Sequence, residues 1–185
     1  MKKSKKSVVF LILIFLAGLS LLLYPSLSDY WNSFHATAVI ASYKQEVSDM
    51  DKKEALRRYQ EALYYNLTLA ERGTAYALSE EERAKYNSVL DVSGTGIMGF
   101  VEIPIIDVCL PIYHGTDEGI LQIAVGHLDW SSLPVGGESS HCVLCGHRGL
   151  PSSRLFTDLD KLSTGDVFTI TICCLVLSLS LASTI

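Results

Sequence analysis

Four side chains able to bind metal or to move protons lie between positions 141 and 147: His141, Cys142, Cys145 and His147. His147 follows a run of β-forming residues and precedes an arginine and a Gly-Leu-Pro turn, so its side chain can face a cleft at a strand end. Imidazole groups, with an ordinary pKa of ~6.5, exchange protons near neutral pH. These properties make His147 a candidate general acid/base. The alternative is a structural histidine held by hydrogen bonds.

The pattern Cys142-x-x-Cys145 between two histidines suggests a zinc or redox centre. In an extended strand, however, these two thiols would point to opposite faces and could not easily share a metal ion or a disulfide. Cys145 and His147 would share a face, but such residues are ~6.6 Å apart, beyond the ~3 Å of a hydrogen bond. The pattern favours a half-buried structural cysteine, and we expect no metal or organic cofactor.

Two further histidines, His114 and His127, end predicted strands in the contexts Tyr-His-Gly-Thr and Gly-His-Leu. Loops gather at strand ends in β-barrels. We therefore expect both side chains to shape a substrate groove rather than to transfer protons.

The secondary structure indicated by the sequence changes from helix to strand near Ser93. After it, short β-prone runs are bounded by glycine and proline, which is typical of a compact barrel or sandwich. Before it, apolar residues recur at helical spacing over 35–72, with a break expected at 48–51 and an end at Gly73. Ser79-Glu-Glu-Glu82 fits a helix-capping box. The expected strands are 97–103, 108–113, 120–125, 141–145 and 167–172.

The composition permits one modest domain with appendages in 185 residues. A net charge of −5 and a pI of about 5.5 give no support for nucleic acid as the main partner. Five irregularly spaced cysteines do not form a disulfide framework.

The N-terminus has the features of a membrane anchor. Four lysines within the first six residues precede the uncharged apolar run Val8–Tyr24, which Pro25 ends. A bilayer core requires ~20 apolar residues, with ~17 as the lower limit. A cleaved signal peptide begins in the same way, but no clear Ala-x-Ala site follows, so a retained anchor is favoured. The lysines place the N-terminus in the cytoplasm, giving a single-pass protein of the cell membrane with an extracellular C-terminal domain.

The segment 173–185 contains no charge, glycine or proline. A second membrane span over 168–185 would be long enough. A soluble domain rarely ends on so apolar a segment. We therefore expect an aberrant tail, produced by a frameshifted or prematurely ended reading frame, with a second span as the alternative.

Several motifs in the second half occur together in one known family: GIMGFVEIP (96–104), LPIYHGT (110–116), AVGHL (124–128), SSLPVGG (131–137), the whole segment 136–162, and Gly165-Asp166. With them, the stretch 96–172 closely resembles the class C, pilin-polymerising sortases, cysteine transpeptidases of Gram-positive cell surfaces. The anchor and the helix around ALYYNL (62–67) agree with the class more loosely.

The resemblance implies an eight-stranded β-barrel and a cysteine that attacks an LPxTG-type sorting signal between Thr and Gly. An amine, in pilin-type members a lysine of the next pilin, then resolves the acyl-enzyme. On this match His147 is the catalytic general acid/base. The partners are a pilin or surface-protein sorting signal, an acceptor amine and the membrane. The expected fold class is mainly β: a partial sortase-type closed β-barrel preceded by N-terminal helices and a transmembrane helix.

Two departures from the family pattern predict a chain that ends before its nucleophile and is inactive. The TLxTC strand has no counterpart, since Cys173 lies too early and lacks the Leu-x-Thr context, and the later catalytic arginine is missing. Arg148 and Arg154 belong to the histidine segment and do not replace it. The Asp-Pro-aromatic lid common in pilin sortases is not found either.

The expected division is 1–26 for the cytoplasmic stub and anchor, 27–92 for a helical extracellular segment, 93–172 for the N-terminal part of the barrel, and 173–185 for the tail. Two alternatives stay open. One is a non-catalytic sortase-like surface protein that binds sorting signals. The other is a membrane metal or redox protein that uses Cys142, Cys145 and His147.

Overall fold

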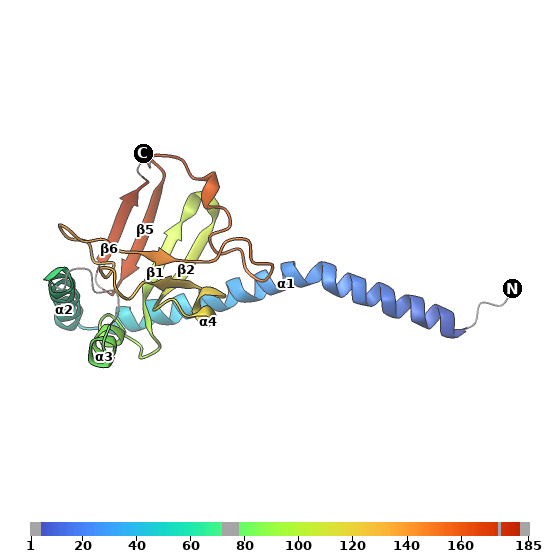
Figure 1. The fold of residues 1–185 in the computed structure, drawn as a ribbon, viewed down its shortest axis with the longest axis horizontal. Coiled ribbons are helices and arrows are strands. Elements are labelled where there is room, and N and C mark those ends of the chain that lie inside the picture. The colour runs from blue at the N-terminus through green and yellow to red at the C-terminus, as the bar shows by residue number, and fades with distance from the viewer. Residues whose placement is uncertain (1–4, 72–77, 174, 182–185) are drawn as a thin grey trace.

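One long helix carries the chain from its N-terminal lysines to the folded domain. The computed structural model describes residues 5–71, 78–173 and 175–181, and in it α1 spans Lys5–Asp49. Pro25 closes the apolar run but not the helix. A proline removes one backbone hydrogen bond, and the helix-forming sequence on both sides continues across that gap. The first half of α1 projects away from the domain, and its second half runs along the sheet (Figure 1).

Two shorter helices follow, α2 (Lys52–Glu71) and α3 (Glu80–Ser88). The break between α1 and α2 confirms the prediction for 48–51. At the start of α3 the Glu82 N–H donates to the Ser79 hydroxyl at 3.3 Å, and the Ser79 N–H donates to the Glu82 carboxylate at 2.8 Å. The predicted capping box is therefore confirmed. The helix end predicted at Gly73 lies outside the described residues.

Six strands form a single sheet in the order β4-β3-β2-β1-β5-β6. Strands β2 and β3 are parallel, and the other neighbouring pairs are antiparallel. Short helical turns η1 (Pro104–Ile106), α4 (Glu118–Leu121) and η2 (Leu159–Lys161) lie in the connections. The strands are β1 (Ile97–Ile103), β2 (Val108–His114), β3 (Val125–His127), β4 (Leu144–Cys145), β5 (Val167–Ile172) and β6 (Leu175–Ser180).

The predicted strands 97–103 and 167–172 are confirmed, and the strand predicted at 108–113 extends by one residue. The strand predicted at 120–125 is wrong, because Asp117 starts the helical turn α4: its carbonyl accepts from the N–H groups of Ile120 and Leu121. The strand predicted at 141–145 shortens to β4. Cys142 therefore lies outside the strand, and the alternation argument does not apply to it.

Within the predicted tail, Leu175–Ser180 form strand β6, while the origin of the tail in a frameshifted or prematurely ended reading frame stays a prediction. This strand pairs with β5 from Val167↔Ser180 to Ile172↔Leu175. Leu175 and Leu177 pack against the core while Val176 is exposed, so the period-two alternation of a strand is present. Within the described part of the chain, α1 is the one helix long and apolar enough to cross a membrane. A second span over 168–185 is excluded because β5 and β6 are paired strands.

Two clusters of buried side chains fix the helices to the sheet. The larger joins β1, β2 and β5 to residues of α2 and α3, including Ala62, Tyr65 and Tyr86. The smaller joins Ile40 and Tyr43 of α1 to β1, and the Tyr43 hydroxyl donates to the Met98 carbonyl at 3.0 Å. The C-terminal half of α1 is therefore an integral part of the domain.

Candidate functional site

His147 follows β4 after a single residue, Gly146, and the loop beyond it folds back against both. The Phe156 N–H donates to the His147 carbonyl at 3.1 Å. A Cβ atom on Gly146 would lie 2.7 Å from the Phe156 ring, which is itself buried. Only glycine fits there without moving the ring, so backbone and ring together fix the position of His147.

The surroundings of the His147 imidazole bear on its predicted role in proton transfer. Its side chain is 34% exposed, and neither ring nitrogen forms a hydrogen bond with a described residue. Nε2 is buried and lies 3.6 Å from Glu118 Oε1, just beyond hydrogen-bonding distance. The Gln122 amide donates to that oxygen at 3.1 Å and orients it. An acidic side chain therefore lies next to the candidate histidine.

His127 is the last residue of β3, the strand that precedes β4 in the chain, and it is completely buried. Its Nδ1 is 2.9 Å from the Tyr86 hydroxyl, and its Nε2 is 2.9 Å from the Ser132 carbonyl oxygen. Burial lowers the pKa of His127 to about 4. The ring is therefore neutral at pH 7, with Nε2–H donating to Ser132 and Nδ1 accepting from Tyr86.

His114, at the end of β2, is 8% exposed. Its Nδ1 lies 2.9 Å from the Gly96 carbonyl oxygen and its Nε2 lies 2.8 Å from that of Val89. These bonds join β2 to the end of α3 and the start of β1. The groove role of His114 and His127 stays a prediction, and their burial gives it no support.

None of the described cysteines forms a disulfide. Burial raises the pKa of the Cys142 thiol to about 12, and burial with the nearby Glu102 carboxylate raises the pKa of Cys109. Cys173 is buried. Over residues 5–71, 78–173 and 175–181, no three His, Cys, Asp or Glu side chains are grouped to hold a metal ion. The zinc interpretation of the Cys142 pattern thus lacks a ligand set.

A family model described as the sortase domain matches residues 101–172. Sortase C1 of Streptococcus agalactiae is 43% identical to this chain and has a TM-score of 0.76, covering 79% of this chain and 76% of its own length. The chain belongs to the sortase family. Among curated protein sequences, none matches it.

Two other class C sortases have the same arrangement. Sortase C of Streptococcus pneumoniae is 40% identical with a TM-score of 0.66, and the match covers 76% of this chain and 71% of that protein. Sortase C-1 of Actinomyces oris is 35% identical with a TM-score of 0.62, and the match covers 69% of this chain and 73% of that protein. The six-stranded sheet is therefore a sortase half-barrel, preceded by a helix that could span a membrane.

In this sortase the two arginines of the histidine segment form ion pairs within their own loop. Arg148 contacts Asp160 at 3.0 Å, and Arg154 contacts Asp158. That neither takes the place of the family's catalytic arginine stays a prediction.

Sequence reasoning missed two residues that contact the candidate histidines. Glu118 lies 29 positions before His147 (147 − 118) and approaches it because α4 precedes β3, the neighbour of β4. The Tyr86 hydroxyl donates to the His127 carbonyl of β3 at 3.0 Å and accepts from the Gly115 N–H at 3.0 Å. The sequence offers one signal for Glu118, its place in Thr-Asp-Glu shortly after the strand that ends at His114. It offers none for Tyr86.

Proposed function

We propose that this chain is a membrane-anchored member of the class C sortases, the enzymes that cleave LPxTG-like sorting signals and join pilin or surface-protein subunits. The observation that carries the proposal is the position of His147. It follows a strand of the half-barrel, partly exposed and free of hydrogen bonds, in a chain 43% identical to a sortase C1.

In this mechanism a cysteine thiolate attacks the carbonyl carbon of the sorting-signal threonine, and the Thr–Gly C–N bond breaks. His147 in its protonated form gives its proton to the leaving glycine amine, and the acyl group stays on sulfur. His147 then takes a proton from the acceptor amine as that amine attacks the thioester. The Glu118 carboxylate lies 3.6 Å from Nε2, within reach of an ion pair with the imidazolium.

The N-terminal part of α1 supports an anchor in the cell membrane. Its apolar residues from Val8 onward are exposed, and the lysines before them favour a cytoplasmic N-terminus. This orientation puts the half-barrel outside the cell, where it meets sorting signals.

We further propose that the chain as printed does not turn over its substrate. Among the described cysteines, Cys142 and Cys109 have raised pKa values and Cys173 is buried, so these three are not activated thiolates. The full chain in lipid nanodiscs, mixed with a fluorescent LPxTG peptide, should show binding by anisotropy and no cleavage by mass spectrometry. Thiol-sensitive cleavage would contradict the inactivity. Absence of both binding and cleavage would count against a sorting-signal ligand.

The role of His147 is tested by supplying a nucleophile. A chimera carries this chain to Ile172 and continues with the matching C-terminal part of the S. agalactiae sortase C1. We expect it to cleave the peptide and to lose roughly 10²-fold or more on His147→Ala, the usual contribution of a general acid/base. His141→Ala, an exposed position in the same segment, is the matched control. Equal rates for the chimera and its His147→Ala variant would overturn the assignment.

A further inference from the structure

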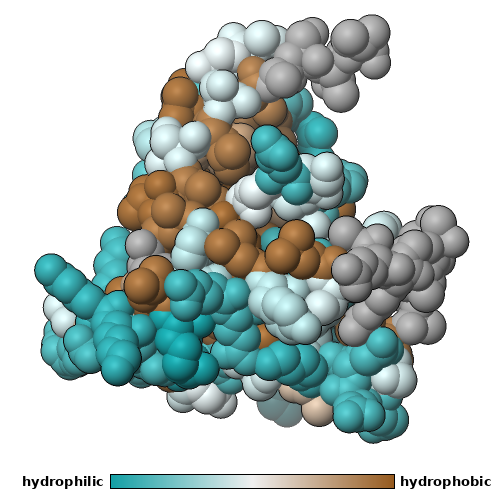
Figure 2. All heavy atoms as spheres, turned by 90° about the vertical axis from the view of Figure 1, so that its left-hand side faces the viewer, coloured by the Kyte–Doolittle hydropathy of each residue, from teal (hydrophilic) through white to brown (hydrophobic). Residues whose placement is uncertain are grey.

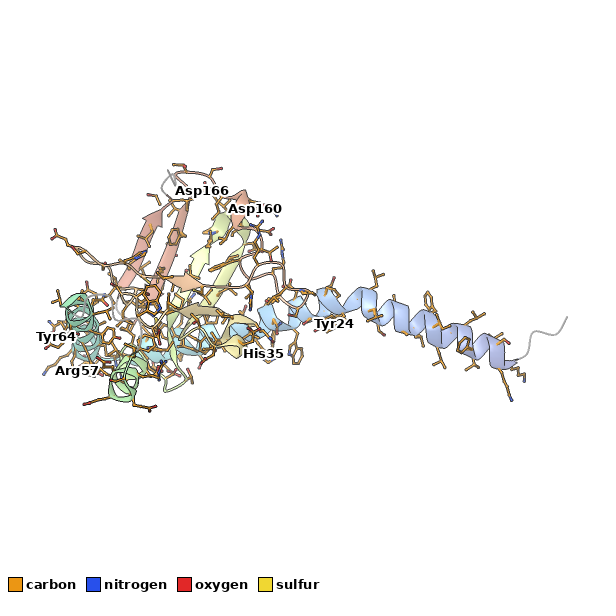
Figure 3. The ribbon with its side chains drawn as sticks, in the orientation of Figure 1. Tyr24, His35, Arg57, Tyr64, Asp160 and Asp166 are labelled. Carbon is orange, nitrogen blue, oxygen red and sulfur yellow. The ribbon has the colours of Figure 1, made fainter. Side chains whose placement is uncertain are left out.

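Beyond Tyr24, α1 has two faces of opposite character. At about 100° per residue, positions 27, 30, 31 and 34 fall on one side of the helix and positions 29, 32 and 36 on the other. Figure 3 shows Tyr24 on the part of α1 just beyond the domain and His35 at the domain's edge. The first face is apolar and open: Leu27, Tyr30, Trp31 and Phe34 are 64%, 71%, 63% and 61% exposed.

The second face is bonded to the loop that follows His147. The Asp29 carboxylate accepts from the Arg154 N–H at 2.7 Å, and the Asn32 amide donates to the Ser152 carbonyl at 2.9 Å. Ala36 is buried against the domain one turn later. These contacts fix the rotation of α1 about its axis, so the aromatic face points away from the domain.

The length of the helix places this aromatic face at a defined depth. A bilayer core of ~30 Å takes up ~20 helical residues at ~1.5 Å each, from Val8 to about Leu27. The interfacial layer adds ~5–7 Å on each side, or four to five residues, which reaches Tyr30 and Trp31. A helix tilt within the usual range of up to ~40° brings Phe34 into the same layer. Tyrosine and tryptophan are the residues enriched there.

We propose that the face formed by Leu27, Tyr30, Trp31 and Phe34 lies in the outer interface of the lipid bilayer and holds the loop 148–156 at the membrane surface. The inference rests on the anchor proposed above. The occupant is lipid because this face continues directly from the apolar run and carries no charge. The polar side chains at this level, Asp29 and Asn32, are turned toward the protein.

Tryptophan fluorescence tests the proposal, since the chain has two tryptophans, Trp31 and Trp130. The full chain with Trp130→Phe is reconstituted in phosphatidylcholine vesicles whose acyl chains carry bromine near the ester linkage or near the methyl end. We expect a blue-shifted emission, quenched most strongly by the shallow bromines and weakly by aqueous iodide. The Trp31→Phe variant, which keeps the 37% exposed Trp130, is the matched control and should respond to iodide and not to bromine.

Two results would overturn the proposal. Quenching by iodide without quenching by bromolipid would put Trp31 in water. Protection from both quenchers would show that a second copy of the chain covers this face. Circular dichroism of each variant confirms that the helices and the sheet are retained.

A Leu16→Trp probe without the native tryptophans separates this inference from the anchor itself. If deep bromines quench this probe while no bromolipid quenches Trp31, the membrane anchor is supported and the interfacial position of Trp31 is refuted. If neither tryptophan responds to bromolipid, the anchor is refuted as well. A Pro151→Trp probe at the exposed tip of the loop should respond to shallow bromines more weakly than Trp31. No response there would refute the surface position of the loop.

Discussion

At the scale of single residues, the three histidines of the sheet have three different environments. His147 is partly exposed without a hydrogen-bond partner, whereas His114 and His127 are buried and bonded at both ring nitrogens. A histidine that must transfer protons requires a free nitrogen and access to substrate. This difference, and not the residue type, separates the catalytic candidate from the two structural ones.

The buried His127 gives stability a defined dependence on pH. The unfolded chain binds a proton at this residue near pH ~6.5, whereas the folded chain does so only near pH 4. Between these values the unfolded state holds more protons, so stability falls as the pH falls and is unaffected by this group above the window. The full effect is about 3 kcal/mol.

Denaturation of the full chain in detergent micelles at pH 7 and pH 4.5 measures this dependence, with His127→Gln as the comparison. The wild type should lose more stability than the variant over this interval, because glutamine does not titrate. Equal losses in both proteins would show that His127 does not cause the pH effect.

At the scale of elements, helices and sheet are joined by a few polar bonds between distant segments. Asn66 of α2 receives the Leu133 N–H on its carbonyl oxygen at 2.8 Å and donates to the Leu133 carbonyl at 3.1 Å. Both partners are buried. This pair holds α2 against the connection from β3 to β4, and so supports the strand that leads to His147.

Replacing Asn66 should therefore weaken the whole domain. Asn66→Ala leaves the buried Leu133 N–H without its acceptor, at ~1–3 kcal/mol, whereas the Leu133 carbonyl still accepts from the Val135 N–H at 2.8 Å. We expect a loss of roughly 1–3 kcal/mol in the free energy of unfolding. Tyr64→Ala, at a 67% exposed position on the same helix, is the control and should have a small effect. Equal effects of the two substitutions would contradict the role of the Asn66 bonds.

At the scale of the whole molecule, the described sheet ends in an edge strand, β6, which pairs with β5 on one side only. β6 stands last in the strand order, and its Val176 and Leu179 are 63% and 39% exposed. Figure 2 shows the corresponding face of the molecule, where hydrophobic side chains gather above the hydrophilic helices. An exposed apolar edge strand offers unpaired backbone groups to other chains. The described half-barrel should therefore associate with itself through β6.

The substitution Val176→Lys should reduce this association, because a charge on an edge strand opposes edge-to-edge pairing. Light scattering of the full chain in detergent micelles should show several-fold fewer large particles than for the wild type. Thr164→Lys adds the same charge at an exposed loop position and should change little. Similar reductions by both lysines would indicate a general charge effect instead of pairing through β6.

The sequence by itself determined the features that local patterns encode. The strands 97–103 and 167–172, the capping box at Ser79 and the break before α2 were all predicted, because periodicity and capping depend on neighbouring residues. The family motifs likewise identified the sortase fold. His147 was recognised as a proton-transfer candidate from its place at a strand end, and that role stays a prediction.

Only the tertiary structure decided which of these residues are buried and what they contact. The Asp29–Arg154 and Asn32–Ser152 bonds join positions 125 and 120 residues apart, and the burial of His114 and His127 depends on the packing of α3 against the sheet. The strand β6 was missed because an apolar segment fits a strand or a membrane span equally well until a partner strand is known. Contacts between distant segments have no local signature, since they arise from the folding of the whole chain.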